Sequence, residues 1–282
     1  MDLTDKKQLI NFLKENRIWP KRKLGQNFLI NQEVIDKMVE TAKLTSKDFV
    51  LEIGPGLGIL TRVLLQTGAK VFSIEKDRDF CAILEKSFHQ KNFTLKCADA
   101  LLEIKNLNLP KNYKVVASIP FQISSPLIQL LLSSSNKPKT MVILMQYEVA
   151  QRIAAKPGES ERGFLTVLVE NLATSKIIQK IDKENFYPIP EVDAAILLIK
   201  TKTEDFETSP FFFRLVKAGF ASKRQQIANS FSNNLALPKE KIIKILKDCS
   251  LDPKLRAEDL ALEEWYGLDK QISKFLKQSS KI

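Results

Sequence analysis

Residues 50–58, Val50-Leu51-Glu52-Ile53-Gly54-Pro55-Gly56-Leu57-Gly58, decide the fold of this chain of 282 residues. A short apolar run that ends at a Gly-x-Gly-x-Gly cluster and continues with apolar residues at helical spacing is typical of the first strand, turn and helix of a nucleotide-binding half. The glycines permit a sharp turn and a close approach of a ligand to the backbone. They do not by themselves identify that ligand.

Two carboxylates beside this turn narrow the choice of ligand. Glu75 ends the next apolar run, at a position where a carboxylate accepts hydrogen bonds from both hydroxyls of a ribose. Glu52 precedes the turn and would place negative charge beside the ligand, which suits a sulfonium or ammonium group better than a pyrophosphate. These residues therefore favour S-adenosylmethionine over NAD.

The composition is that of an ordinary globular protein with an excess of positive charge. With 44% hydrophobic and 27% charged residues, the chain is long enough for one medium and one small domain. No apolar run has the length of a membrane span and no secretory signal is apparent, so we expect a cytoplasmic protein without a membrane partner. The net charge of +11 indicates an anionic partner, nucleic acid before membrane surface, although a lysine-rich solvated surface would give the same total.

Histidine and cysteine chemistry is not expected. The only histidine, His89, lies in a polar segment and is predicted at the surface, which disfavours a histidine base. Cys81, Cys97 and Cys249 are odd in number and lack metal-type spacing. We therefore expect no metal site and no disulfide, and we interpret all three cysteines as buried small hydrophobic residues.

Strands alternate with helices over the first two thirds of the chain. This alternation predicts an α/β fold, a doubly wound, Rossmann-like seven-stranded sheet with an antiparallel hairpin at its edge. The carboxyl ends of the strands should form the functional edge, which includes the glycine turn, Glu75, Asp99 and residues 118–121.

The two ends of the chain depart from this pattern. Apolar residues at helical spacing predict a short helix in the first twenty residues. The basic stretch 21–29 is predicted as a loop outside the core, either a solvated linker or a flap over the cofactor. Five short apolar stretches after residue 203, the last two separated by Gly267, predict an all-α domain. The predicted domains are 1–202, with a helical extension at 1–20, and 203–282, with the boundary within 201–205.

Residues 118–121, Ser-Ile-Pro-Phe, follow the fourth strand and could hold a planar base. An exocyclic amine is a poor nucleophile because its lone pair is delocalised into the ring, and acceptors at its two N–H groups favour a pyramidal nitrogen. The Ser118 hydroxyl and the carbonyl of Ile119 or Pro120 would supply these acceptors, while Phe121 would stack on the base. Positioning would provide most of the catalysis, and a base in duplex RNA would have to be flipped out. A proline turn with a core phenylalanine would explain the same residues without any function.

Together these stretches resemble the small-subunit rRNA adenine N6-dimethyltransferases. The resemblance covers about residues 20–265 and rests on the stretches 25–29, 52–61, 75–77, 98–100, 118–126, 155–163, 186–193, 222–235 and 256–260. It implies a class I methyltransferase that transfers methyl groups from S-adenosylmethionine to N6 of two adjacent adenines near the 3′ end of small-subunit rRNA. It also implies a pre-ribosomal small subunit as the partner and an rRNA-recognition role for the all-α domain. We expect the protein to be a monomer.

The resemblance further implies roles for single residues. It assigns cofactor binding to Asn27, Leu29, Gly54, Gly56, Glu75, Asp99 and Ser118. It assigns catalysis at the target amine to Ser118, Pro120 and Phe121. Phe186 would flank the flipped base, and from their charge we expect phosphate contacts from Lys21, Arg22, Lys23, Lys223 and Arg224.

The catalytic stretch departs from the family pattern. The family usually has asparagine and tyrosine where this chain has Ser118 and Phe121. Serine is shorter and lacks the amide carbonyl, so its oxygen can fall short of the target amine or need a bridging water. We expect Ser118 to act as the acceptor with lower efficiency.

Three alternatives stay open at this point. One is a large-subunit rRNA adenine methylase of the macrolide-resistance type. Another is a catalytically weakened ribosome-assembly factor on the same fold, which the substitution at Ser118 suggests. The third is a dehydrogenase, which Pro55 and the motif at 118–121 disfavour.

Overall fold

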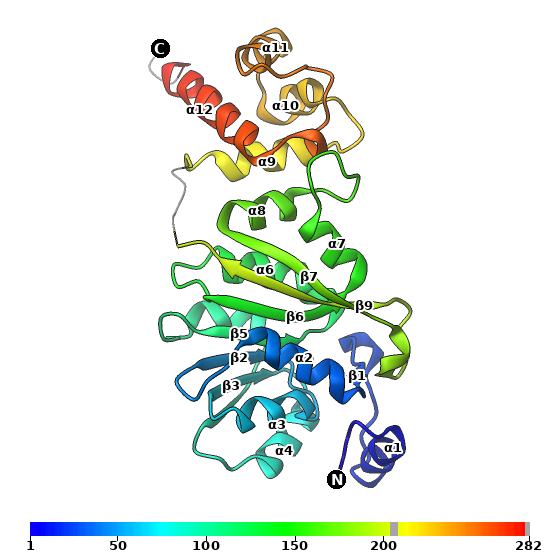
Figure 1. Cartoon of the computed structure of the whole chain (residues 1–282). Coiled ribbons are helices and arrows are strands. Elements are labelled where there is room, and N and C mark those ends of the chain that lie inside the picture. Colours follow the sequence, from blue (N-terminus) through cyan, green and yellow to red (C-terminus); the bar gives the residue numbers. More distant parts are fainter. Residues whose placement is uncertain (204–207, 280–282) are drawn as a thin grey trace. The chain divides into compact units, whose positions relative to one another are not determined.

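The computed structural model describes residues 1–203 and 208–279, apart from the side chains of Arg22 and of residues 277–279. The chain divides into two compact units, Met1–Ala150 with Thr174–Thr201 and Gln151–Ala173 with Lys202–Ile282 (Figure 1). The boundary predicted within 201–205 falls partly on residues 204–207, which lie outside the described residues. The segment 151–173, which precedes that boundary in the sequence, belongs to the second unit.

A seven-stranded sheet in the order β4-β3-β2-β5-β6-β9-β7 forms the first unit. Strands β2 to β6 are parallel, and β9 runs antiparallel to β6. The strands are β2 Phe49–Ile53, β3 Lys70–Glu75, β4 Phe93–Cys97, β5 Lys114–Ser118, β6 Thr140–Gln146, β7 Ala173–Ile181 and β9 Ala194–Thr201. The predicted Rossmann-like α/β sheet is confirmed.

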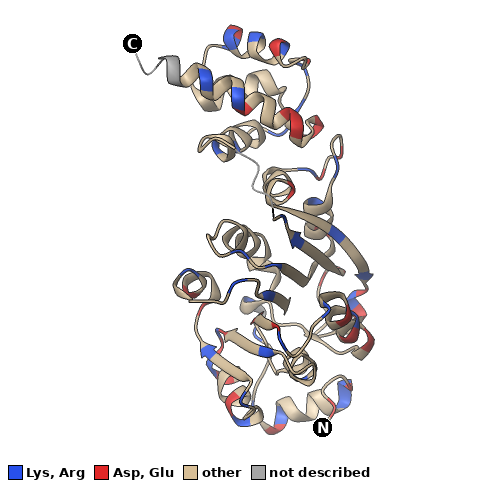
Figure 2. Ribbon diagram, turned by 60° about the vertical axis from the view of Figure 1, so that its left-hand side comes forward, with Lys and Arg blue, Asp and Glu red and all other residues tan. Residues whose placement is uncertain are grey.

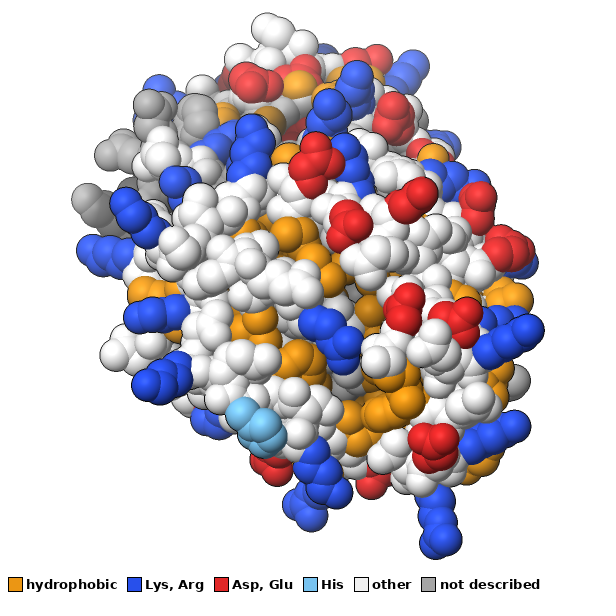
Figure 3. Space-filling view, turned by 60° about the horizontal axis from the view of Figure 1, so that its bottom comes forward, with side chains coloured by type: hydrophobic (Ala, Val, Ile, Leu, Met, Phe, Trp, Pro, Cys, Tyr) orange, Lys and Arg blue, Asp and Glu red, His pale blue; other side chains and the backbone are white. Residues whose placement is uncertain are grey.

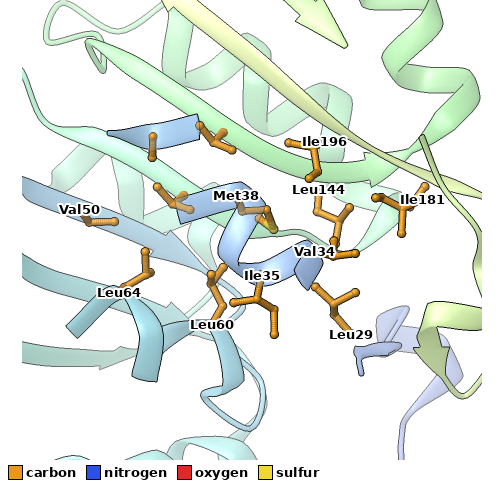
Figure 4. Close-up of a cluster of buried hydrophobic side chains, with 14 of the residues drawn as sticks. Leu29, Val34, Ile35, Met38, Val50, Leu60, Leu64, Leu144, Ile181 and Ile196 are labelled. Carbon is orange, nitrogen blue, oxygen red and sulfur yellow. The ribbon is translucent and has the colours of Figure 1, made fainter. Parts of the chain in front are cut away.

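Helices cover this sheet because their apolar faces match those of the strands. In Figure 4, Leu64 of α3 lies beside Val50 of β2, and Met38, Leu144 and Ile196 belong to the same buried cluster. Each such side chain contributes about 1.5–3 kcal/mol when it is fully buried. Helix α2 Gln32–Ala42 precedes β2, and the helices that come after it are α3 Ile59–Gln66, α4 Arg78–Ser87, α5 Ala100–Glu103, α6 Ser124–Leu132 and α7 Tyr147–Ala154.

The N-terminal segment is a packed part of the first unit. Helix α1 (Lys6–Glu15) buries Leu9 and Leu13 in a cluster that includes Phe28 and Phe80. After a 3-10 turn, η1 (Arg22–Leu24), strand β1 (Phe28–Leu29) pairs antiparallel with β8 (Phe186–Tyr187). Both residues of β1 are buried, so the expectation that 21–29 lies outside the core is wrong for Phe28 and Leu29. The partner strand is distant in the sequence, and two residues show no periodicity.

One cysteine prediction is wrong and the histidine prediction is confirmed. Cys81 and Cys97 form a disulfide with their Cα atoms 6.0 Å apart, because α4 packs on β4 and brings the two residues together. Cys81 is buried, whereas Cys97 is exposed and Cys249 is half-buried, so the three are not all buried hydrophobic residues. The only histidine, pale blue in Figure 3, lies at the surface among apolar and charged patches.

The second unit is a helical cluster around Trp265, which is fully buried with Phe212 and Phe231. Its helices are α8 Phe164–Leu172, α9 Phe212–Phe220, α10 Ile227–Leu235, α11 Lys239–Asp248 and α12 Leu262–Ser279, with a 3-10 turn, η5, at Ala257–Asp259. The predicted break at Gly267 is wrong, since α12 runs through it. A glycine in a helix costs about 1 kcal/mol, which the burial of Trp265, Leu268 and Ile272 on one face outweighs.

Charge is spread over both units, and Figure 2 shows Lys and Arg residues on elements of each. Among the helices that the structure describes, none has both the length and the apolarity that a membrane crossing requires.

Candidate active site

A cavity of about 240 Å³ lies at the carboxyl ends of β2, β3, β4 and β5. It takes its walls from the segments that follow these strands, from residues 23–29 and from β8. The predicted site residues that line it are Lys23, Asn27, Leu29, Gly54, Gly56, Glu75, Asp99, Ser118, Pro120, Phe121 and Phe186. The carboxyl edge of the sheet thus brings the predicted cofactor and target residues into one cavity.

The glycine turn forms the floor of this cavity. Gly54 and Gly56 have φ angles of +66° and +57°, in the left-handed region that side chains other than glycine rarely adopt. A Cβ added at Gly54 would lie 3.4 Å from Pro120 Cδ. The turn therefore requires glycine for its backbone and packs directly beneath the segment that carries the predicted catalytic residues.

Glu75 is held in place by three backbone donors. Its Oε1 accepts the N–H groups of Lys76 and Asp77, both at 2.8 Å, and its Oε2 accepts the Gly56 N–H at 3.0 Å. Burial raises the pKa of Glu75 above its ordinary value, although these backbone donors act in the opposite direction. The carboxyl group is therefore fixed between the end of β3 and the glycine turn before any ligand arrives.

Asp99 is also bonded within the chain. Its Oδ1 accepts the Leu101 N–H at 3.0 Å and caps α5, and its Oδ2 lies 2.7 Å from Lys76 Nζ. The hydrogen bond from Lys76 lowers the pKa of Asp99 below its ordinary value. Asp99 is thus ionised at neutral pH and serves as an acceptor, as its predicted role at an adenine amine requires.

Glu52 was expected to place a negative charge beside the ligand, but the structure shows it buried and hydrogen-bonded within the chain. It is buried between β2, β3 and α3, where its Oε2 accepts hydrogen bonds from Thr61 Oγ1 at 2.8 Å and Ser73 Oγ at 2.7 Å. Burial raises its pKa to about 7, so the side chain is only partly ionised at neutral pH. Its Oε1 is buried without a partner among the described residues, and the residue lines the cavity.

The target side of the cavity carries free acceptors. Within the described part of the chain, no hydrogen bond engages the half-buried Ser118 hydroxyl or the Ile119 carbonyl. The Pro120 carbonyl, in contrast, accepts the Ile123 N–H at 3.1 Å in the 3-10 turn η3 (Phe121–Ile123). Of the two backbone acceptors that the sequence left open, Ile119 is the one without a donor.

The two predicted aromatic residues differ in exposure. Phe121 is half-buried and packs against the apolar cluster beneath the sheet edge. Phe186 is only 2% exposed, so its ring forms part of the cavity wall.

The basic residues predicted to contact phosphate differ in whether they are bonded to other residues of the chain. Lys21 Nζ lies 2.8 Å from Asp77 Oδ1 and 2.7 Å from Asp79 Oδ2, whereas Lys23 is exposed. The side chain of Arg22 lies outside the described part of the structure. In the second unit, Lys223 and Arg224 are exposed, and Lys223 donates to the Ser160 carbonyl.

Sequence reasoning gave no individual role to three residues that shape the site, Gln26, Asp77 and Gln122. Asp77 accepts hydrogen bonds from Lys21 and Gln26, and Gln122 lies against Gly25, where an added Cβ would be 2.5 Å from its Oε1. The only available signal was at Asp77, since an aspartate one residue before an apolar-periodic stretch is a typical helix N-cap. The contacts of Gln26 and Gln122 have no sequence signal because they join distant segments.

A second hollow, of about 460 Å³, shares residues 25–27, 121 and 122 with the first. It continues along residues 188–192, where Ile189 and Val192 are 54% and 42% exposed. Among the described residues, no group of three or more His, Cys, Asp or Glu side chains could hold a metal ion.

Comparison with known proteins identifies similar chains along most of this length. The sequence model of the ribosomal RNA adenine dimethylase family matches residues 19–274. A Clostridium botulinum (strain Langeland) protein named ribosomal RNA small subunit methyltransferase A is 37% identical over 250 residues, which cover 86% of this chain and 90% of the relative. A Moorella thermoacetica protein of the same name is 34% identical over 275 residues, which cover 92% and 95% of the two chains.

Two solved structures are similar as well. The crystal structure of a dimethyladenosine transferase from Plasmodium falciparum matches with a TM-score of 0.75 and 27% identity, over 86% of this chain and 96% of that one. The crystal structure of the 23S rRNA methyltransferase ErmE matches with a TM-score of 0.69 and 25% identity, over 87% and 99% of the two chains.

Proposed function

This chain belongs to the ribosomal RNA adenine dimethylase family, and we propose that it methylates N6 of two adjacent adenines near the 3′ end of small-subunit rRNA, with S-adenosylmethionine as the methyl donor. The predicted family, methyltransferase fold and cofactor are confirmed by the comparisons. The substrate is the rRNA within a pre-ribosomal small subunit, in the cytoplasm. We further propose that the enzyme acts as a monomer.

One observation carries this proposal. The Ser118 hydroxyl and the Ile119 carbonyl, two acceptors without partners among the described residues, share a cavity with the fixed carboxylate of Glu75. A ribose-binding group and a pair of amine acceptors within one cavity are what a transfer from an adenosyl cofactor to an exocyclic amine requires.

The cavity residues fit S-adenosylmethionine, which supplies an activated methyl group on a sulfonium centre. Glu75 provides acceptors for the ribose hydroxyls, and the bare backbone at Gly54 and Gly56 leaves room for the ligand. The Glu52 Oε1 is a buried acceptor without a partner in the described chain, as expected for a wall that receives a cationic ligand. Asp99 provides an ionised acceptor for an adenine amine.

The chain's own contribution to catalysis is positioning. The Ser118 hydroxyl and the Ile119 carbonyl accept the two N–H groups of the target amine, which aims the nitrogen lone pair into the cavity, and Phe121 packs on the base. Each transfer replaces one N–H hydrogen of the amine by a methyl group, and the displaced proton leaves to solvent. The first methylation therefore engages both acceptors and the second engages one, so a single site can perform both steps.

A large-subunit rRNA adenine methylase is the second candidate. The likeness to ErmE, at a TM-score of 0.69, favours it. The two relatives named above, each at least 34% identical, carry a small-subunit name and favour the first candidate. The position of the modified nucleotide separates the two.

The test combines purified protein and S-adenosylmethionine with undermethylated small subunits and, in a parallel reaction, with large subunits. Nuclease digestion and mass spectrometry should detect N6,N6-dimethyladenosine at two adjacent positions near the 3′ end of the RNA. Modification of large-subunit RNA alone would establish the second candidate. Transfer by Ser118→Asn but not by the wild type would show that this chain is a catalytically weakened assembly factor and would overturn the proposal.

A further inference from the structure

The basic stretch before β1 is bonded to the start of α4 by a compact set of polar contacts. We call residues 21–27 the flap. Lys21 Nζ donates to Asp77 Oδ1 at 2.8 Å and to Asp79 Oδ2 at 2.7 Å, and Gln26 Nε2 donates to Asp77 Oδ2 at 2.7 Å. The Lys21 N–H in turn donates to Gln26 Oε1 at 2.6 Å. Both carboxylate oxygens of Asp77 are therefore occupied by the flap.

Asp77 connects this set of contacts to the cofactor site. Its own N–H donates to Glu75 Oε1 at 2.8 Å, and Glu75 Oε2 accepts the Gly56 N–H at 3.0 Å. The same Asp77 side chain caps α4 by accepting the Asp79 N–H at 3.1 Å. A continuous chain of hydrogen bonds thus runs from the flap through Asp77 to the carboxylate that binds the ribose.

The electrostatics of this cluster favour an internal role for Lys21. The Asp77 side chain is 2% exposed, and the Lys21 side chain is 46% exposed. Burial raises the pKa of Asp77, but the hydrogen bonds from Lys21 and Gln26 outweigh this effect and hold the pKa below its ordinary value. One ammonium group faces two carboxylates, so the cluster has an excess of negative charge. Such a cluster repels a phosphate and does not attract one.

The flap also forms part of the cavity. Residues 23–27 line it together with Glu75, Asp99 and Ser118. Contacts that hold the flap against α4 therefore close one side of the cavity around its ligand.

We propose that Lys21 is a positioning residue that latches the flap over the cofactor cavity, and that it does not contact RNA phosphate. The latch acts through Asp77 on Glu75, so closure of the flap and binding of the cofactor stabilise each other. Opening of the latch then limits release of the demethylated product, S-adenosylhomocysteine. The inference rests on the cofactor assignment made above.

The test measures cofactor and RNA binding separately in Lys21→Met, Lys21→Arg and Lys14→Met. Lys14 is an exposed residue of α1, so Lys14→Met removes the same charge without touching the latch. We expect Lys21→Met to bind S-adenosylhomocysteine about tenfold more weakly, mainly through faster dissociation, as for the loss of a charge-assisted hydrogen bond. Lys21→Arg should restore most of the affinity, and Lys14→Met should match the wild type.

The salt dependence of RNA binding tests whether Lys21 contacts phosphate instead. The slope of log affinity against log salt should be the same for Lys21→Met and the wild type, because a residue that binds no phosphate releases no counterion. A slope reduced by about one, together with unchanged cofactor affinity, would overturn the latch and restore the phosphate contact. If the wild type itself binds no S-adenosylhomocysteine, the cofactor assignment fails, which is a separate result from a failure of the latch.

One further variant keeps the test decisive if Lys21→Met folds poorly, and a double variant extends the test if Lys21→Met folds well. Asp79 is 55% exposed, so Asp79→Asn removes one latch partner with little effect on the core, and a smaller loss of cofactor affinity is expected. In the double variant with Lys21→Met, the two losses should not add, because both act on one contact. Additive losses would contradict the latch.

Discussion

The two walls of the cavity differ in how much of their hydrogen bonding is already satisfied. The acid wall, which comprises Glu75 and Asp99, has carboxylates that each accept two or more hydrogen bonds from the chain itself. The target wall, residues 118–121, has a Ser118 hydroxyl and an Ile119 carbonyl that accept none from the described residues. The difference teaches that the wall with the proposed cofactor-binding role is preorganised, whereas the wall with the proposed target-binding role keeps acceptors for its substrate.

This arrangement suits an enzyme that binds one constant ligand and one macromolecular substrate. Fixed carboxylates bind the cofactor without losing side-chain freedom, which strengthens binding. Free acceptors on the target wall remain available until an adenine amine arrives. A base that cannot present two N–H groups leaves them unpaired, which disfavours its binding.

Removal of the Glu75 carboxylate from the acid wall should have the largest effect, which is on cofactor affinity. Glu75→Ala deletes the acceptor for two ribose hydroxyls, each worth about 1.5–3 kcal/mol, so the cofactor Kd should rise about a thousandfold. Titration calorimetry with S-adenosylhomocysteine measures this change, and Glu85→Ala, at an exposed position of α4, is the matched control. A Kd close to that of the wild type would show that the acid wall is not the ribose site.

The next largest effect concerns Glu52 and the dependence of the free energy of unfolding on pH. Because burial raises the pKa of Glu52 from 4.5 to about 7, the folded protein retains a proton that the unfolded chain releases. The stability that this group provides is complete below pH 4.5 and is lost as the pH rises to about 7, by about 3 kcal/mol in total.

Glu52→Gln should remove this pH dependence while keeping the shape of the side chain. Urea denaturation between about pH 5 and pH 8 measures it as a difference between the two curves, with the exposed Glu40→Gln as control. Parallel stability curves for Glu52→Gln and the wild type would contradict the prediction.

A smaller and more selective effect should follow on the target wall. Ser118→Ala removes one acceptor at the target amine, so kcat should fall about tenfold while the KM for S-adenosylmethionine stays unchanged. Ser125→Ala, in α6, removes a hydroxyl outside the cavity lining and serves as the control. A change in the KM for S-adenosylmethionine at constant kcat would show that Ser118 acts in cofactor binding and not at the target amine.

The smallest effect should come from the second unit. Lys223→Glu and Arg224→Glu should each reduce the slope of log RNA affinity against log salt by about one, which corresponds to one phosphate contact. Cofactor affinity should stay unchanged. Filter binding at several salt concentrations measures the slope, and Lys274→Glu, on an exposed part of α12, is the control. An unchanged slope would remove both residues from the RNA interface.

Local sequence patterns predicted the parts of the fold that depend on neighbours in the chain. The apolar run at 50–53 and its glycines predicted β2, the turn and α3, and the alternation of strands and helices predicted the sheet. The pairing of β1 with β8 was missed because each strand has only two residues. The continuity of α12 through Gly267 was missed because the burial of Trp265 depends on distant helices.

The candidate site divides in the same way. Glu75, Asp99 and Ser118 could be predicted as site residues because each lies at or just after the carboxyl end of a strand, and parallel strands place these ends at one edge of the sheet. The charge of Lys21 was visible in the sequence, but its partners were not, since Asp77 and Asp79 lie on another element. Whether a charged residue faces RNA or a carboxylate of its own chain depends on what the fold places within about 4 Å of it.

The sequence by itself thus determined the strand–turn–helix at residues 50–66, the acids that follow the neighbouring strands and the family to which they belong. Periodicity and residue type at fixed spacing carry that information. Only the tertiary structure decided that Glu52 is buried and partly protonated, that Ile119 and not Pro120 offers a free carbonyl, and that Lys21 is bonded to Asp77. These outcomes depend on distances between segments far apart in the chain, and such distances are fixed by packing.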